Sequence, residues 1–169
     1  MKRVSYLEAM ALATERMSNG GAFLSVGGDR PNTMTIGWGS IGFYWDRPVF
    51  IALVRPSRHT FGMLNETRCF TVSVPTADPM RRQLTFAGTV SGRDVNKFEG
   101  HGLTSAPAQA VDAPIVRECG LHFECVVRLE QDMTADRMDA DVRRAAYPSG
   151  DLHRMYFGEI VACYRTDEN

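Results

Sequence analysis

Residues 22–54 read AFLSVGGDRPNTMTIGWGSIGFYWDRPVFIALV, and this stretch decides the fold class. Turn residues, Gly27-Gly28-Asp29 and Asp46-Arg47-Pro48 among them, divide it into short runs rich in β-branched and aromatic residues. The run 49–54 is apolar throughout, which is typical of a strand covered on both faces. We therefore expect strands at 22–26, 33–36, 41–45 and 49–55.

The N-terminal segment predicts a helix over 5–17. Ser5 followed by Glu8 has the spacing of a capping box, and Asn19-Gly20-Gly21 supplies the stop. The apolar stripe is expected at Leu7, Met10, Ala11, Ala13 and Met17. Two short helices should follow further along. Ser57 can cap residues 58–65, and Asp78-Pro79 can open a segment that Gly88 closes.

The remaining strands are expected at 69–74, 121–129 and 155–164, with Gly158 as a candidate bulge. In the run 121–129 one face should be buried and the other wetter. The buried face would carry Phe123, Cys125, Val127 and Leu129, and the wetter face His122, Glu124, Val126 and Arg128. Residues 100–114 predict a surface loop, and the Asp- and Arg-rich stretch 132–147 an exposed excursion with a helical turn. Short strands with few small helices indicate one mostly β domain over 1–169, an antiparallel β-barrel.

Composition excludes several classes of protein. With 44% hydrophobic and 23% charged residues the chain is ordinary for a globular protein, and the net charge of −1 gives no field that would attract nucleic acid or an anionic membrane. The longest apolar run is far shorter than a membrane span, and Glu8 and Glu15 interrupt any signal-peptide core, so a cytoplasmic protein is expected. The four cysteines and four histidines show no metal-ligand spacing, and buried cysteines are expected.

The run Gly37-Trp38-Gly39-Ser40-Ile41-Gly42 fits the dinucleotide fingerprint GxGxxG but lacks its context. A strand-like run ending in Pro48 follows it where that fingerprint needs a helix. A Rossmann site is therefore excluded.

Other segments carry residues suited to a ligand. Asn32-Thr33-Met34-Thr35-Ile36-Gly37-Trp38 puts small polar side chains beside a glycine, which suits the hydrogen-bonding edge and flat face of an isoalloxazine ring, although a polar edge strand would look similar. Arg55-Pro56-Ser57-Arg58-His59-Thr60 combines arginines and hydroxyls with a helix N-terminus and suits an anion, although a solvated helix start is the plainer alternative. Ser91-Gly92-Arg93-Asp94-Val95-Asn96-Lys97-Phe98 supplies a lysine in a chain whose cations are nearly all arginine.

These three segments, followed by the stretch from His153 to Phe157-Gly158-Glu159-Ile160-Val161, occur in the order found in the flavin reductase-like family with the FMN-binding split barrel. The sequence resembles that family, which includes flavoredoxins and ferric reductases, over roughly 18–165. The resemblance implies an antiparallel split β-barrel, a homodimer, bound FMN and NAD(P)H as reductant.

The resemblance also implies roles for particular residues. The isoalloxazine ring would contact Asn32, Met34, Thr35, Gly37, Trp38 and Ser40. The ribityl phosphate would be held by Arg55, Ser57, Arg58 and Thr60, with Lys97 near the flavin or its phosphate. His153 would lie by the ring where substrate approaches, as the candidate catalytic residue. Two features depart from the family pattern. The chain stops soon after its last strand, and 132–147 matches no motif, although Arg143 and Arg144 could contact a pyridine nucleotide.

The expected function is that of an FMN-dependent oxidoreductase that passes electrons from NAD(P)H to free flavin, ferric iron or a partner protein. The alternatives are a flavin-holding electron carrier, a β-barrel binding module without flavin, and an enzyme like pyridoxamine-phosphate oxidase, against which the 91–98 pattern argues. In the carrier, Trp38, Phe43 or Tyr44 would block a nicotinamide from the ring.

Overall fold

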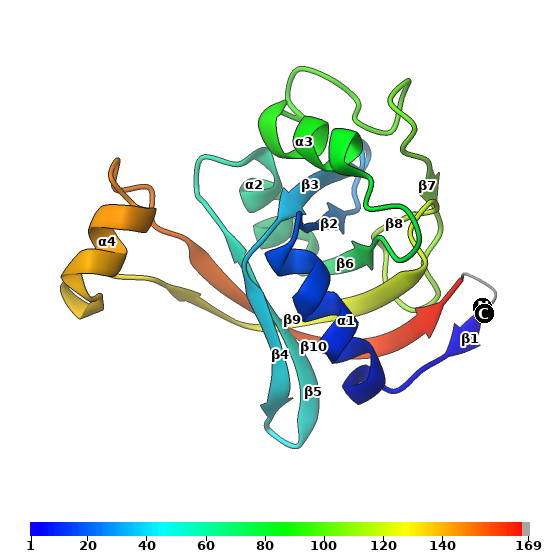
Figure 1. The fold of residues 1–169 in the computed structure, drawn as a ribbon, viewed down its shortest axis with the longest axis horizontal. Helices are drawn as coiled ribbons and strands as arrows, with labels where there is room; N and C mark the ends of the chain where they lie inside the picture. Colours follow the sequence, from blue (N-terminus) through cyan, green and yellow to red (C-terminus); the bar gives the residue numbers. More distant parts are fainter. Residues whose placement is uncertain (167–169) are drawn as a thin grey trace.

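A single curved antiparallel sheet organises the chain in the computed structural model, which describes residues 1–166 (Figure 1). Its strands run in the order β3-β2-β6-β9-β10-β5-β4, and β1 adds to β10. The bounds are β1 Lys2–Arg3, β2 Ala22–Val26, β3 Asn32–Ile36, β4 Gly39–Tyr44, β5 Arg47–Val54, β6 Cys69–Val74, β9 Leu121–Asp132 and β10 Arg154–Arg165. A separate pair, β7 (Ser105–Ala106) with β8 (Ile115–Val116), lies in the loop before β9. The predicted mostly β, antiparallel class is confirmed.

The two edges of the main sheet, β3 and β4, are consecutive in the chain. Only Gly37 and Trp38 separate them, so the edges can be at most about 11 Å apart at that point, since an extended chain spans at most ~3.6 Å per residue. The sheet must therefore curl back on itself without the two edges pairing. This is the predicted split barrel, and its opening lies where β3 passes into β4.

The barrel interior is filled by apolar side chains from every strand of the curved path. Phe50, Phe70 and Phe123 are fully buried and meet edge to face, with ring centroids 5.5 and 6.4 Å apart. Gly158 sits at a register shift in β10, where an added Cβ would come within 2.6 Å of the Phe70 ring. The predicted bulge is confirmed, and glycine is required there because the core leaves no room for a side chain.

The helix α1 (Tyr6–Ser18) covers one end of the barrel and confirms the predicted N-terminal helix. Ser5 caps it by accepting a hydrogen bond from the backbone of Leu7 at 3.2 Å. The predicted apolar stripe was partly wrong, because Leu7 and Ala11 are exposed. The buried positions are Ala9, Ala13 and Met17. These three residues are spaced by four and share one face of the helix, which packs on the sheet, whereas Leu7 and Ala11 lie off that face.

Two predicted helix starts were displaced. The helix α2 (His59–Thr67) begins after Arg58, and its N-cap residue makes no side-chain cap bond, so Ser57 does not cap it. The Ser57 hydroxyl instead donates to Asp151 Oδ2 at 2.6 Å.

The helix α3 (Arg81–Thr89) begins two residues later than Pro79 would place it. Met80 has a left-handed φ of 48°, and the Asp78 carboxylate accepts the Met80 backbone N–H at 2.8 Å, so the chain turns before the helix starts. Gly88 lies inside α3 and does not close it.

The predicted wetter face of 121–129 was wrong for His122 and Glu124, which are fully buried. The segment 105–119 covers that face of β9. Glu124 accepts the backbone N–H groups of Gln109 and Ala110 at 2.7 and 2.6 Å, and the Tyr164 hydroxyl at 2.7 Å. Polar residues on one face of a strand therefore indicate a solvent-exposed face only where no loop covers that face and supplies hydrogen-bond partners.

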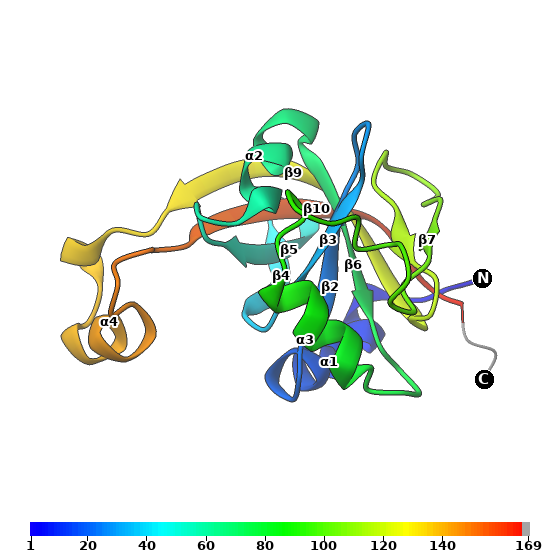
Figure 2. The same cartoon turned by 90° about the horizontal axis from the view of Figure 1, so that it is seen from above.

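Past the barrel, the far ends of β9 and β10 form an arm that carries η1 (Ala135–Arg137) and α4 (Ala140–Ala146), projecting away from the other helices (Figure 2). Leu129 lies on this arm and is 40% exposed, so its predicted burial was also wrong. Arg154 and Asp132 pair across the arm at 2.6 Å, and Arg154 also lies 4.8 Å over the Phe61 ring. The exposed excursion with a helical turn is confirmed, and we call residues 133–152 the lobe.

Three of the four cysteines, Cys119, Cys125 and Cys163, are buried as predicted, and Cys69 is half-buried. Burial raises the pKa of each thiol. In the described part of the chain, no helix combines the length and apolar character needed to traverse a bilayer.

Candidate functional site

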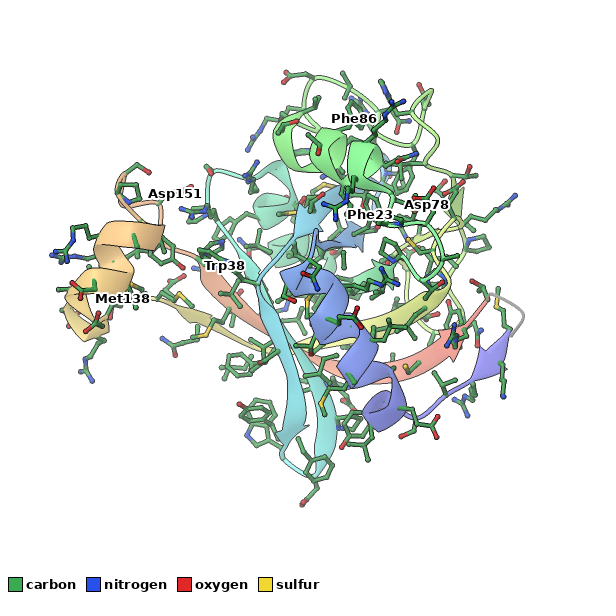
Figure 3. The ribbon with its side chains drawn as sticks, viewed as in Figure 1. Phe23, Trp38, Asp78, Phe86, Met138 and Asp151 are labelled. Carbon is green, nitrogen blue, oxygen red and sulfur yellow. The ribbon has the colours of Figure 1, made fainter. Side chains whose placement is uncertain are left out.

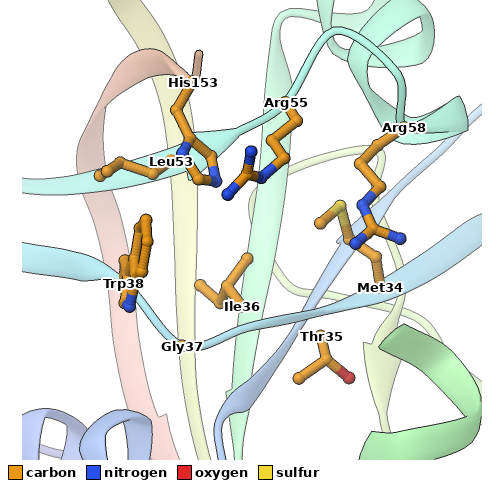
Figure 4. A pocket seen from close by; sticks show the side chains of 9 residues that line it. All are labelled: Met34, Thr35, Ile36, Gly37, Trp38, Leu53, Arg55, Arg58 and His153. Carbon is orange, nitrogen blue, oxygen red and sulfur yellow. The ribbon is translucent and has the colours of Figure 1, made fainter. Parts of the chain in front are cut away.

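Two adjoining pockets open at the split between β3 and β4. The first, which we call the β3–β4 pocket, has a volume of about 180 Å³ and is lined by Met34, Thr35, Ile36, Gly37, Trp38, Leu53, Arg55, Arg58 and His153 (Figure 4). The second, the cationic pocket, has a volume of about 110 Å³, and its lining includes Asn32, Ser57, Thr60, Gly92, Arg93 and Lys97. Met34 and Arg58 line both, so the two pockets adjoin, and we call the pair the groove.

The floor of the β3–β4 pocket is the end of β3 and the turn that follows it. Gly37 and Trp38 lie outside both strands, so their peptide groups are not part of the sheet ladder. The Thr35 hydroxyl points away from the pocket and donates to the Leu84 carbonyl of α3 at 2.6 Å (Figure 4). Thr35 therefore holds α3 against the sheet, and only the rest of the residue faces the pocket.

One wall of the β3–β4 pocket is a cluster of rings. The His153 ring lies 5.2 Å from Trp38 and 5.5 Å from Tyr147, and Tyr147 Oη shares a hydrogen bond with His153 Nδ1 at 2.8 Å. Burial, followed by the charge of Arg55, lowers the pKa of His153 to about 4. His153 is therefore a neutral imidazole near pH 7, fixed in orientation by Tyr147.

Arg55 lies in the β3–β4 pocket beside His153 and anchors the lobe (Figure 4). Its guanidinium donates to the carbonyls of Asp151 and Ala146 at 2.7 and 3.1 Å and stacks on the Tyr147 ring at 4.9 Å. The Ala146 carbonyl belongs to the last residue of α4, where helix carbonyls need partners. Both hydrogen bonds that the structure gives the Arg55 side chain go to the lobe, and Arg55 does not line the cationic pocket.

The cationic pocket carries three positive side chains, Arg58, Arg93 and Lys97, and among its described lining residues there is no Asp or Glu. Lys97 is only 3% exposed, and its ammonium donates to the Ala87 carbonyl at 2.7 Å. Burial, with a smaller contribution from Arg58, lowers the pKa of Lys97 to about 8. A buried lysine without a carboxylate is costly unless an anion completes the site.

His59 and the start of α2 border the cationic pocket. Burial first, and then Arg93, Lys97 and Arg30, lower the pKa of His59. His59 is the first residue of α2, whose positive dipole end opens on the pocket. The N-cap residue of α2 is Arg58, and its side chain does not cap the helix, so the first N–H groups of α2 are available to an anion.

Asn32 and Thr60 join β3 to α2 beneath the cationic pocket. The Asn32 amide donates to the Thr60 hydroxyl at 2.9 Å, and both side chains are buried. Gly92 lets the 91–97 loop approach this pair, because an added Cβ there would lie 2.2 Å from Asn32 Oδ1. The loop that carries Lys97 is thus held against the strand that forms the floor of the groove.

Eleven of the twelve predicted site residues line this groove: Asn32, Met34, Thr35, Gly37, Trp38, Arg55, Ser57, Arg58, Thr60, Lys97 and His153. Ser40 does not, because it lies exposed on β4 outside both pockets. Sequence reasoning missed Ile36, Leu53, Arg93 and Tyr147. Arg93 could have been found from its place in the 91–98 segment, whereas nothing in the sequence singles out Tyr147. Among residues 1–166 no three His, Cys, Asp or Glu side chains gather as metal ligands.

Comparison with known proteins identifies the family. The sequence profile of the flavin reductase like domain matches residues 14–169, and the chain belongs to that family. A relative from Archaeoglobus fulgidus, described as an uncharacterized protein, is 29% identical over 140 residues, covering 82% of this chain and 68% of the relative.

Two solved structures are similar in fold. One is the flavoredoxin of Desulfovibrio vulgaris (Miyazaki F), with a TM-score of 0.68 and 23% identity over 87% of this chain and 69% of that one. The other is BorF, the flavin reductase component of a bacterial two-component tryptophan halogenase, with a TM-score of 0.63 and 27% identity over 89% of this chain and 81% of that one. Family membership together with these folds agrees with a flavin-related oxidoreductase.

Proposed function

We propose that this protein binds FMN in the groove and acts as an NAD(P)H-dependent oxidoreductase that passes electrons to flavin or to another acceptor. The observation that carries the proposal is Lys97, a buried cation in a pocket with Arg58 and Arg93 and with no carboxylate among the described residues that line it. That pocket adjoins the β3–β4 pocket, whose lining includes the turn residues Gly37 and Trp38. The arrangement matches a ligand with a phosphate at one end and a flat, hydrogen-bonding ring at the other.

The residues divide by the part of the ligand they would contact. Arg58, Ser57, Thr60 and Lys97 would hold the phosphate at the N-terminus of α2. The backbone from Met34 to Trp38 would hold the edge of the ring, as would Asn32 where it faces the groove. When bound, the flavin supplies the hydride and electron transfer chemistry, and the protein supplies its orientation and electrostatic surroundings.

His153 is the candidate catalytic residue beside the ring. Because its imidazole is neutral near pH 7, it adds no positive charge to the place where a reductant or acceptor would approach. Its ring lies 5.2 Å from that of Trp38, and both rings line the β3–β4 pocket. The hydride step needs no acid or base from the protein, so the role of His153 would be to position the reactants.

The electron-carrier alternative requires the ring face to be blocked. Phe43 and Tyr44 lie on the β4–β5 hairpin, 60% and 42% exposed, and neither lines the β3–β4 pocket. Trp38 does line it, but it is 46% exposed at the edge. These positions favour a reductase that admits a nicotinamide over a carrier that excludes one.

A homodimer is part of the proposal. The tip of the β4–β5 hairpin exposes a set of large side chains, in which Tyr44 and Trp45 both pack on Phe157 at 5.7 and 6.2 Å. An exposed aromatic patch of this kind marks an interaction surface. Light scattering on the pure protein should give the mass of two chains, and Trp45→Lys should shift it toward one chain.

An absorption spectrum tests the central claim. The protein is mixed with FMN, passed through a desalting column and scanned, then mixed anaerobically with NADPH or NADH. We expect a retained flavin spectrum that either reductant bleaches. A protein that retains no flavin at micromolar concentration contradicts the proposed site, and retention without bleaching by either nucleotide favours the carrier.

A further inference from the structure

The lobe contains a second concavity that the flavin site does not use. Its volume is about 720 Å³, within the usual range of about 300–1,000 Å³ for small-molecule sites, and its lining includes Arg143, Arg144, Tyr147, Ser149 and Leu152. We call it the lobe pocket. Figure 3 shows the lobe, marked by Met138 and Asp151, on the side of the barrel where Trp38 lies.

The lobe pocket and the β3–β4 pocket share a boundary. Tyr147 lines the lobe pocket, and its ring contacts Trp38 at 6.0 Å and His153 at 5.5 Å, both of which line the β3–β4 pocket. Leu152, next to His153 in the chain, also lines the lobe pocket. A long ligand with one end in the β3–β4 pocket can therefore continue past Tyr147 into the lobe.

Charges on the lobe are nearly all matched within it. Asp139 caps α4 by accepting two backbone N–H groups at 2.9 and 3.1 Å. Asp141 pairs with Arg144, and Asp136 lies 3.7 Å from Arg137. The remaining carboxylate, that of Asp151, accepts the Ser57 hydroxyl. Each acidic side chain of the lobe thus already has a partner.

Arg143 is the cation left over. Among residues 1–166 its side chain has no hydrogen-bond or ion-pair partner, and no described residue lining the lobe pocket is acidic. Arg144 and the Ser149 hydroxyl line the same concavity. A guanidinium with free donors, a second guanidinium and a hydroxyl match the oxygens of a phosphate monoester.

We infer that the lobe pocket binds the adenosine end of the dinucleotide reductant, and that Arg143 recognises the 2′-phosphate that distinguishes NADPH from NADH. The inference rests on the proposed function, since the nicotinamide end must stack on the flavin ring at the mouth of the β3–β4 pocket for reduction to occur. The rest of the dinucleotide would then extend past Tyr147 into the lobe. There the 2′-phosphate, which only NADPH carries, would bind Arg143, the one arginine of the lobe that has no partner among the described residues.

Calorimetry with NADP⁺ and NAD⁺ tests the inference, on the flavin-free protein and on the FMN-loaded protein. Wild type should bind NADP⁺ at least tenfold more tightly than NAD⁺. The double variant Arg143→Gln/Arg144→Gln should bind the two nucleotides equally, with NAD⁺ affinity and FMN affinity unchanged. The matched control is Arg137→Gln, which removes an arginine of the same lobe that does not line the pocket and should keep the preference. In turnover, the double variant should raise KM for NADPH at least tenfold at unchanged kcat.

The outcomes separate the two proposals. An equal loss of NAD⁺ and NADP⁺ affinity, a wild type without preference for NADP⁺, or an equal effect of the Arg137 control would overturn the assignment of Arg143. Loss of FMN retention in the wild type would instead overturn the proposed function, and the NADP⁺ preference of the flavin-free protein would still decide the lobe pocket.

Discussion

The substitution Lys97→Met is the sharpest test of where the phosphate of the flavin binds. Methionine keeps an apolar stem of similar length and removes the charge together with the hydrogen bond to the Ala87 carbonyl, in a site where the lysine is 3% exposed. A hydrogen bond to a charged group contributes about 1.5–3 kcal/mol, so FMN should bind roughly 10- to 100-fold more weakly, at about 1.4 kcal/mol per factor of ten. Fluorescence titration of FMN measures the affinity, and Lys2→Met, which alters the exposed lysine of β1, is the control.

The pH dependence gives a second readout of the same residue. Burial lowers the pKa of Lys97 to about 8, whereas a phosphate monoester is already a dianion above its second pKa of about 6. Between pH 7 and pH 9 the wild type should therefore lose about tenfold in FMN affinity as the free protein gives up the lysine proton. Lys97→Met should show no such loss. A flat wild-type profile, or FMN affinity in the variant equal to wild type, would refute the assignment.

The stability of the flavin-free protein should change in the opposite direction. Between pH 8 and pH 10.5 the unfolded chain holds the Lys97 proton and the folded chain does not, so this group makes the free energy of unfolding rise with pH. Below pH 8 the full cost of the buried charge is present. Lys97→Met should therefore leave the melting temperature of the flavin-free protein unchanged or raised at pH 7, which separates weaker FMN binding from misfolding.

Four further outcomes are expected. Arg55→Ala should speed proteolysis within 133–152, because two hydrogen bonds to lobe carbonyls are lost, while FMN affinity changes less than threefold; a loss as large as that of Lys97→Met would contradict the anchoring role. Gly158→Ala should destabilise the fold by about 1–3 kcal/mol, since its Cβ would overlap the buried Phe70 ring. Gly62→Ala, inside α2 with open space around it, should instead stabilise the fold by roughly 0.5–1 kcal/mol. Denaturant titration measures the free energy of unfolding of both variants. The His153 ring should titrate near pH 4 by NMR, and the free energy of unfolding should fall as the pH drops from 6.5 to 4, because only the unfolded chain takes up that proton; a midpoint near 6.5 would show that the ring is solvated.

Local pattern was enough to predict the seven strands from β3 to β4 along the main sheet, whereas the two-residue strands β1, β7 and β8 were missed. The run 49–54 is covered on both faces, as its continuous apolar sequence predicts. The hairpin turn that precedes β5 is harder to predict from the sequence. Trp45 and Asp46 adopt positive φ values of 50° and 57°, although neither is the glycine that usually occupies such positions. The strand pairing on either side, from Gly39 opposite Ala52 to Tyr44 opposite Arg47, imposes that turn.

Burial by segments that are distant in the sequence could not be predicted from the local pattern. The polar faces of His122 and Glu124 looked solvated because the partners that satisfy them, among them the backbone of 109–110 and the Ser73 hydroxyl, are far away in the sequence. Tyr147 carries no local signal for the same reason: its contacts with Arg55, Trp38 and His153 exist only once the lobe folds back on the barrel. Site residues near the ends of strands could be predicted, whereas Tyr147, on the irregular lobe, could not.

Strand register explains why weak segments far apart in the sequence converge on one site. Arg154 of β10 pairs with Val54 of β5, so His153 and Arg55, the next residues outward on two antiparallel strands, must lie beside each other. β5 then leads through residues 55–58 into the N-terminus of α2, while the two-residue turn after β3 brings Gly37 and Trp38 across the open edge of the sheet. Each segment alone would suit an ordinary helix start or edge strand, and the site follows from their geometry. Inserting one residue between His153 and Arg154 should therefore separate the histidine from Arg55 and Trp38 while leaving the cationic pocket intact.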